Sequence, residues 1–170
     1  LWMLLPNQEK MMLKKDINNL NSIKFNSLEK KDIELSQNNE DGILGLGWSH
    51  PSYGRSIGNI GVWSEGYYSS FIFEPTDYKI NSITIILKQV LTNKKNDDLR
   101  IRIFINNKKY KNIDLSSKNK QIYIDNLKNY IVKGTNIITF NILNPLTPIS
   151  KLESVDGRLL GILAEKVIFK

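Results

Sequence analysis

Short runs in which apolar and polar residues alternate are the feature that most limits the folds open to this chain. In residues 99–105 (LRIRIFI), Leu or Ile occupies every second position, and Arg occupies two of the positions between them. This spacing places the apolar side chains on one face of a strand and the charged ones on the other. The strands expected from such runs are residues 22–26, 32–36, 68–74, 80–90, 99–105, 110–115, 121–125, 137–143 and 161–169.

The composition also favours strands over helices. Ile is the commonest residue, with 24 copies, whereas Ala, the best helix former, occurs once, at Ala164. Residues 106–108 (NNK) predict a hairpin turn, because Asn tolerates positive φ. Residues 126–133 predict a short helical turn that ends at Gly134.

We therefore expect an all-β fold, an antiparallel β-sandwich of jelly-roll type, in residues 42–170. Residues 1–41 are expected to form a short N-terminal helix or linker with two weak strands.

A glycine-rich stretch lies between the N-terminal segment and the main series of strands. Residues 42–66 hold seven of the ten Gly and two of the three Trp. Flexible linkers of this composition lack Trp. We therefore expect a long, structured loop here.

The net charge of +7 is concentrated in one part of the chain. Residues 79–133 carry 13 basic and 4 acidic side chains, whereas residues 48–78 carry 1 basic and 3 acidic ones. Most of the lysines fall at predicted hairpin ends and edges, where Lys discourages edge-to-edge aggregation. An anionic glycan or a membrane surface is the alternative partner for this charge. Nucleic acid is not expected, because no basic helix or zinc-finger spacing accompanies it.

Several classes of function are disfavoured by what the sequence lacks. There is no Cys, which excludes disulfides, thiolate metal sites and a Cys nucleophile. His50 is the only His. We do not expect it to act as a general base, because the adjacent hydroxyl, Ser49, would point to the opposite side of a strand. Glu153 and Asp156 are too few for a calcium site. We expect no catalytic residue, metal or cofactor in this chain, and its apolar runs are shorter than the roughly 18 residues of a membrane span.

Three motifs resemble a known family. They are residues 47–51 (GWSHP) followed by 61–66 (GVWSEG), residues 134–140 (GTNIITF), and residues 156–162 (DGRLLGI). Together they resemble the β-sandwich domain at the C-terminus of bacterial envelope-glycan transferases, which include phosphoglycerol transferases and the glycosyltransferases that build capsule or O-antigen. The resemblance covers residues 42–170.

The resemblance implies an accessory module that handles a glycan and does not itself catalyse transfer. The implied partners are a polysaccharide or lipid-linked oligosaccharide and a catalytic transferase domain in the same polypeptide. The implied location is the bacterial cytoplasm near the inner membrane, or alternatively the periplasm. The competing interpretation is a docking or oligomerisation domain of the same transferase that makes no direct contact with sugar.

Aromatic and polar residues around the glycine-rich stretch are the candidate sugar site. Sugar rings stack their C–H patches on aromatic faces, and their hydroxyls need donors and acceptors nearby. The alternative for the two Trp is that they plug one end of the sandwich, with their indole N–H groups bonded to loop carbonyls. The candidate ligand-binding residues are Trp48, His50, Tyr53, Trp63, Glu65, Tyr67, Tyr68 and Arg158.

Three further residues are predicted to have structural roles. Gly134 and Asn136 form a turn device, in which Gly supplies positive φ and Asn bonds its own backbone. Asp156 and Arg158 flank Gly157 ahead of the last strand. One interpretation is that they fix the preceding loop, Arg158 through an ion pair with Glu65 or Asp156 through backbone N–H groups. The other is that they bind a polar ligand.

Overall fold

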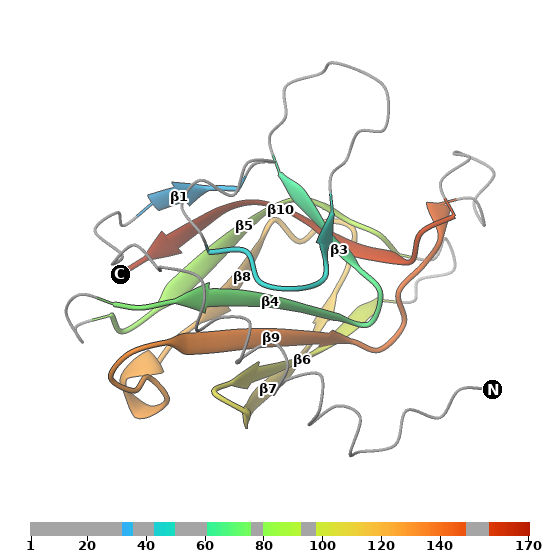
Figure 1. Ribbon diagram of the computed structural model, residues 1–170. Coiled ribbons are helices and arrows are strands. Elements are labelled where there is room, and N and C mark those ends of the chain that lie inside the picture. Colours follow the sequence, from blue (N-terminus) through green and yellow to red (C-terminus); the bar gives the residue numbers. More distant parts are fainter. Residues whose placement is uncertain (1–31, 36–42, 50–60, 76–79, 93–97, 149–156) are drawn as a thin grey trace.

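The computed structural model describes residues 32–35, 43–49, 61–75, 80–92, 98–148 and 157–170. These residues form two antiparallel β-sheets that pack face to face (Figure 1). The expectation of an all-β antiparallel sandwich is confirmed. In the described residues, no helix is long and apolar enough to cross a membrane.

The larger sheet has six strands and is organised around the last one. β10 pairs with β5 along one side, and on the other side with β3 near its start and β1 near its end. β2 and β8 form the two ends of the sheet, so its main path runs β2-β3-β10-β5-β8. The strands are β1 (Asp32–Glu34), β2 (Trp48–Ser49), β3 (Val62–Glu65), β5 (Ile83–Val90), β8 (Gln121–Ile124) and β10 (Leu160–Phe169).

The smaller sheet has four strands in the order β4-β9-β6-β7. β6 and β9 are its interior strands, and β7 is an edge. A 3₁₀ helix, η1 (Leu127–Asn129), lies between β8 and β9 in the chain. The strands are β4 (Tyr68–Phe73), β6 (Leu99–Ile105), β7 (Lys108–Leu115) and β9 (Asn136–Ile142).

The core lies between the two sheets and is rich in Ile. In β6 the side chains of Ile101, Ile103 and Ile105 are at most 1% exposed, as the alternation in this run predicts. Phe71 and Phe140 meet edge to face, with ring centroids 5.5 Å apart. Each fully buried side chain of this kind stabilises the fold by about 1.5–3 kcal/mol. Burial of these side chains between the two sheets is therefore a main source of the fold's stability.

The predicted hairpin at residues 106–108 is present between β6 and β7. Asn106 and Asn107 both have positive φ, 49° and 65°. Two such residues form the type I′ turn, whose twist matches that of the flanking strands. The Asn106 side chain also accepts a hydrogen bond from the Ile137 backbone N–H at 2.9 Å, which ties the turn to β9.

The expectation of a single long loop over residues 42–66 is wrong, because β2 and β3 lie within it. In β3, Val62 and Trp63 are both buried although they face opposite sides of the sheet. A strand buried on both faces shows no alternation, and glycines at both ends obscured it further. The strand expected at residues 32–36 is confirmed as β1, which pairs with β10 and so belongs to the larger sheet. The strand expected at residues 22–26 and the helix or linker expected at the N-terminus lie outside the described residues.

Candidate functional site

Residues 43–49 cross from the smaller sheet to the larger one and carry Trp48 and Ser49. Gly45 and Leu46 exchange backbone hydrogen bonds with Ser70 of β4, while β2 pairs with β3. Gly47 makes the crossing with φ at 73°, and a Cβ there would lie 1.8 Å from the Tyr68 carbonyl oxygen. Only glycine fits this position. The Gly-Trp pair of the first motif is therefore a point where the chain changes sheets.

Trp48 points into the sandwich from this crossing. Its ring stacks on Phe71 with centroids 4.7 Å apart and an interplanar angle of 12°. Its indole Nε1–H donates to the Ser70 carbonyl oxygen at 2.7 Å. Trp48 thus packs against the core with its polar group satisfied, which is the arrangement of the plug alternative.

Trp63 lies on the opposite face of the same sheet. Trp48 pairs with Ser64 and Ser49 pairs with Trp63, so the strand alternation separates the two Trp side chains. Trp63 is 9% exposed and packs with Leu91, Leu160 and Leu163 in a small cluster of its own. The two Trp therefore do not form one binding surface.

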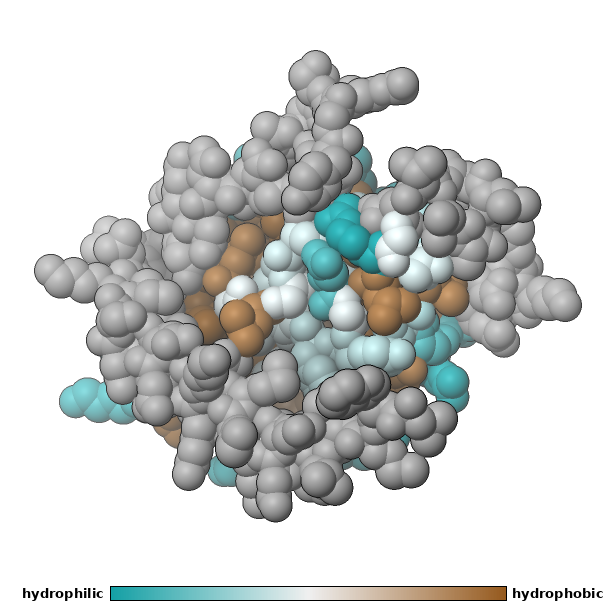
Figure 2. Space-filling view, turned by 45° about the vertical axis from the view of Figure 1, so that its right-hand side comes forward, coloured by the Kyte–Doolittle hydropathy of each residue, from teal (hydrophilic) through white to brown (hydrophobic). Residues whose placement is uncertain are grey.

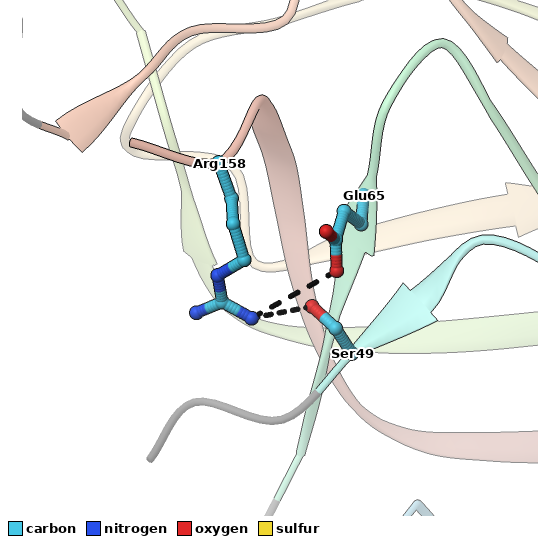
Figure 3. A network of polar contacts seen from close by, with 3 residues as sticks. All are labelled: Ser49, Glu65 and Arg158. Carbon is cyan, nitrogen blue, oxygen red and sulfur yellow. Dashed lines mark hydrogen bonds and ion pairs between the residues drawn. The ribbon is translucent and has the colours of Figure 1, made fainter. Parts of the chain in front are cut away.

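A polar cluster of Ser49, Glu65 and Arg158 lies at this edge of the larger sheet (Figure 3). The Arg158 guanidinium donates to Ser49 Oγ at 2.7 Å and lies 3.8 Å from Glu65 Oε2. The side chains of Arg158 and Glu65 are 21% and 42% exposed. An ion pair this accessible adds at most about 1 kcal/mol to stability. Its main consequence is to hold a donor, an acceptor and a hydroxyl together where a ligand can reach them.

The backbone fixes both sides of this polar cluster. Leu160 at the start of β10 pairs with Glu65, and the Gly66 N–H donates to the Leu159 carbonyl at 2.8 Å. These contacts set the position of Arg158 relative to β3. The Arg158–Glu65 pair was one of the structural alternatives expected from the sequence, and it is present.

Tyr67 is an exposed aromatic residue close in the chain to Glu65 of the cluster. It lies in the turn between β3 and β4, two residues from Glu65, and is 50% exposed. Gly66 supplies the positive φ of the turn, 78°. The Tyr67 carbonyl accepts a hydrogen bond from the Ile142 N–H at 2.8 Å, so the backbone beneath the ring is anchored to the end of β9. This turn can hold an aromatic face in a fixed place.

The other candidate residues are not all part of this site. Tyr68 begins β4, pairs with Asn141 and is half-buried. His50, Tyr53 and Asp156 lie outside the described residues. Ser49, whose hydroxyl meets Arg158, is absent from the candidate ligand-binding set. No local signal could add it, because the two residues are 109 positions apart.

Gly134 and Asn136 belong to a turn far from the cluster. Gly134 has φ at 89°, and the Asn136 amide donates to the carbonyls of Val132 and Gly134 at 3.0 and 2.8 Å. Asn136 is completely buried. Asn136 contacts the backbone of its own turn and accepts a hydrogen bond from Asn106 Nδ2, which lies in the turn between β6 and β7.

The described residues contain no group of three or more His, Asp or Glu that could hold a metal ion. Burial and a hydrogen bond to Asp125 raise the pKa of Tyr110 to about 12. That pair joins β7 to the end of β8, away from Arg158. The chemistry available at the Arg158 cluster is hydrogen bonding, with the exposed Tyr67 nearby in the chain.

Comparisons with known proteins give weak structural similarities. No family model and no curated protein matches the chain. A family 36 carbohydrate-binding module in complex with calcium and xylotriose aligns with 83% of this chain and 100% of its own, at 14% identity and a TM-score of 0.45. A family 35 carbohydrate-binding module from Clostridium thermocellum aligns with 81% of this chain and 98% of its own, at 14% identity and a TM-score of 0.43. Similarity at this level carries no argument about the ligand, and the fold assignment rests on the chain's own strand pairing.

Proposed function

We propose that this chain is a non-catalytic carbohydrate-binding module of a bacterial surface-polysaccharide sugar transferase. The observation that carries the proposal is the exposed Tyr67, on an anchored turn two residues from Glu65, together with the accessible Glu65–Arg158 pair. Two of the three motifs that resemble envelope-glycan transferase domains meet here. Residues 47–51 and 61–66 supply Ser49 and Glu65, and residues 156–162 supply Arg158.

The chemistry of this cluster suits an uncharged sugar. One face of a sugar ring stacks on Tyr67, while Arg158 donates to ring hydroxyls and Glu65 accepts from them. The guanidinium and carboxylate largely neutralise each other at 3.8 Å. Neither a strong anion nor a strong cation is favoured at such a site, so a neutral or weakly charged glycan fits best.

The parent enzyme in this proposal is a capsule-type glycosyltransferase or a phosphoglycerol-type transferase in the same polypeptide. The first places the module in the bacterial cytoplasm near the inner membrane, and the second places it in the periplasm. Reading the coding sequence on the 5′ side of Leu1 tests this part. A transferase domain in the same reading frame supports it, and a reading frame that encodes no such domain contradicts it.

Affinity measurements on two matched variants test sugar binding. Tyr67 and Tyr123 are both 50% exposed, but Tyr67 adjoins β3 whereas Tyr123 lies on β8, at the far end of the larger sheet. We expect Tyr67→Ala to weaken binding of a neutral capsular oligosaccharide about tenfold and Tyr123→Ala to leave it unchanged, since an aromatic contact of this size is worth roughly 1–3 kcal/mol. Equal affinities for both variants would contradict the site.

The competing function is a docking module that touches no sugar, and the packing of both Trp favours it. Trp48 stacks on Phe71, and Trp63 is 9% exposed, so neither presents an open ring. A docking surface for a partner protein is usually a continuous apolar patch. On the face shown in Figure 2, the apolar side chains of the described residues form separate groups with weakly polar side chains between them. On this face, the described residues therefore show no continuous apolar patch of the kind that docking uses.

A further inference from the structure

Two arginines in the smaller sheet are not explained by protection of a sheet edge. Arg100 and Arg102 are exposed residues of β6, which pairs with β9 on one side and β7 on the other. Lysines on the edge strand β7 guard against unwanted pairing. A charge on an interior strand has no such role. They are the polar half of the alternation in β6, which places both side chains on the outer, solvent-facing side of the smaller sheet.

The register of the sheet places Arg102 in a row of polar side chains on the outer face. Arg102 pairs with Asn112 of β7 and with Asn141 of β9, and Asn141 pairs with Tyr68 of β4. At about 4.8 Å per strand, the row spans roughly 14 Å across the four strands. Among the described residues, the side chains of Asn112, Asn141 and Arg102 make no hydrogen bond or ion pair.

The charge around this row is positive. On this face, β6 and β7 carry the basic side chains Arg100, Arg102 and Lys109. On the outer face, Arg100 pairs with Asp114 on one side of the row, and Lys109 opposes Phe104 on the other. Asp114 is the acidic side chain among the outward-facing residues of β6 and β7. In the part of the chain that the structure describes, the row thus combines a guanidinium that has no ion-pair partner with two amides, and the charged side chains around it are mostly basic.

We propose that this row, from Tyr68 through Asn141 and Arg102 to Asn112, is a second binding surface, which takes an acidic oligosaccharide bearing uronic-acid carboxylates. A guanidinium binds a carboxylate through two parallel hydrogen bonds, and Asn amides both donate to and accept from hydroxyls. An oligosaccharide lying across the strands meets Asn141, Arg102 and Asn112 in turn, with Tyr68 at the end of the row. Single-stranded nucleic acid fits less well, because it needs several aromatic rings for its bases to stack on.

This surface adjoins the Tyr67 site at Tyr68, but it is centred on Arg102 of β6 and differs from that site in charge. It takes from the proposed function only that the ligand is a sugar. Binding at the two sites is separable, because Tyr67→Ala leaves the β6 row intact and Arg102→Gln leaves the Ser49–Glu65–Arg158 cluster intact.

An NMR titration of the whole chain with a galacturonate hexamer tests the proposal. The matched ligand is the methyl-esterified hexamer, which keeps the backbone but lacks the charge. Arg102→Gln is compared with Lys88→Gln, which removes one charge from an exposed side chain on β5 of the other sheet. Loss of a charge-assisted bond predicts roughly tenfold weaker binding for Arg102→Gln. We expect no change for Lys88→Gln, saturable shifts in β6, β7 and β9, and much weaker binding of the ester.

Four results would each overturn the proposal. They are equal weakening by the two charge variants, equal binding of acid and ester, the absence of saturable shifts on β6, and equally tight binding of a single-stranded oligothymidylate to the same residues. Tyr67→Ala serves as the independent variant. If Tyr67→Ala loses binding of the neutral sugar but still binds the galacturonate hexamer, both sites stand. If Tyr67→Ala weakens neutral-sugar binding but Arg102→Gln does not weaken hexamer binding, only the second site fails.

Discussion

Asn136→Ala tests whether the buried turn between η1 and β9 is held by one side chain. Asn136 is 0% exposed, and its amide makes four hydrogen bonds. Its Oδ1 accepts from the Val132 N–H at 2.9 Å and from Asn106 Nδ2 at 2.8 Å. Its Nδ2 donates to the carbonyls of Val132 and Gly134. All the hydrogen-bonding capacity of this amide is therefore used.

The magnitude follows from the number of bonds. At about 0.5–1.5 kcal/mol each, four bonds give roughly 2–6 kcal/mol. Val132 is 51% exposed, so water can replace some of the lost partners in its loop. We expect Asn136→Ala to lower the free energy of unfolding by about 3 kcal/mol. Asn136→Asp should be at least as damaging, because it directs an oxygen toward two carbonyls while keeping the side-chain size.

Unfolding in guanidinium chloride, followed by Trp fluorescence, measures the change in the free energy of unfolding. Asn141→Ala is the control, because Asn141 lies on the same strand with its side chain on the outer face. A change within about 0.5 kcal/mol is expected there. An Asn136→Ala change below about 1 kcal/mol, or one equal to that of Asn141→Ala, would refute the reasoning.

Two further predictions concern stability. Gly47→Ala should cost at least about 2 kcal/mol, because positive φ strains Ala and its Cβ would overlap the Tyr68 carbonyl, whereas Gly66→Ala, with a similar φ but open space around Cβ, should cost about 1 kcal/mol. Equal losses in thermal or chemical unfolding would show that the crossing at Gly47 is looser than described. The second prediction concerns Tyr110, whose pKa is about 12 in the folded chain and about 10 in the unfolded chain. Between these values the unfolded chain has already lost the proton, so stability should fall as pH rises from 10 to 12. Tyr110→Phe should remove that part of the fall, and an unchanged pH profile would count against it.

The strands predicted best are those with one buried face. β6 matches its expected bounds because Leu and Ile alternate with Arg along it. β3 was missed because it is buried on both faces and therefore shows no alternation. Strand length also limits the prediction, because the two residues of β2 are too few to show an alternation of apolar and polar side chains.

The candidate site was predictable only in part. The aromatic and charged residue types indicated a surface, and the Arg158–Glu65 pair could be anticipated. The separation of Trp48 and Trp63 could not, because it depends on the register between β2 and β3. The row around Arg102 depends on two further registers, β6 with β7 and β6 with β9. Partners of this kind are set by tertiary pairing, which one sequence does not reveal.

The most direct test of the central claim is a chemical-shift titration of the wild-type chain with neutral capsular or lipid-linked oligosaccharide from its source. We predict saturable shifts at Ser49, Glu65, Tyr67 and Arg158, with β8 around Tyr123 unaffected. An absence of saturable shifts at these four residues at millimolar glycan would contradict sugar binding at this site.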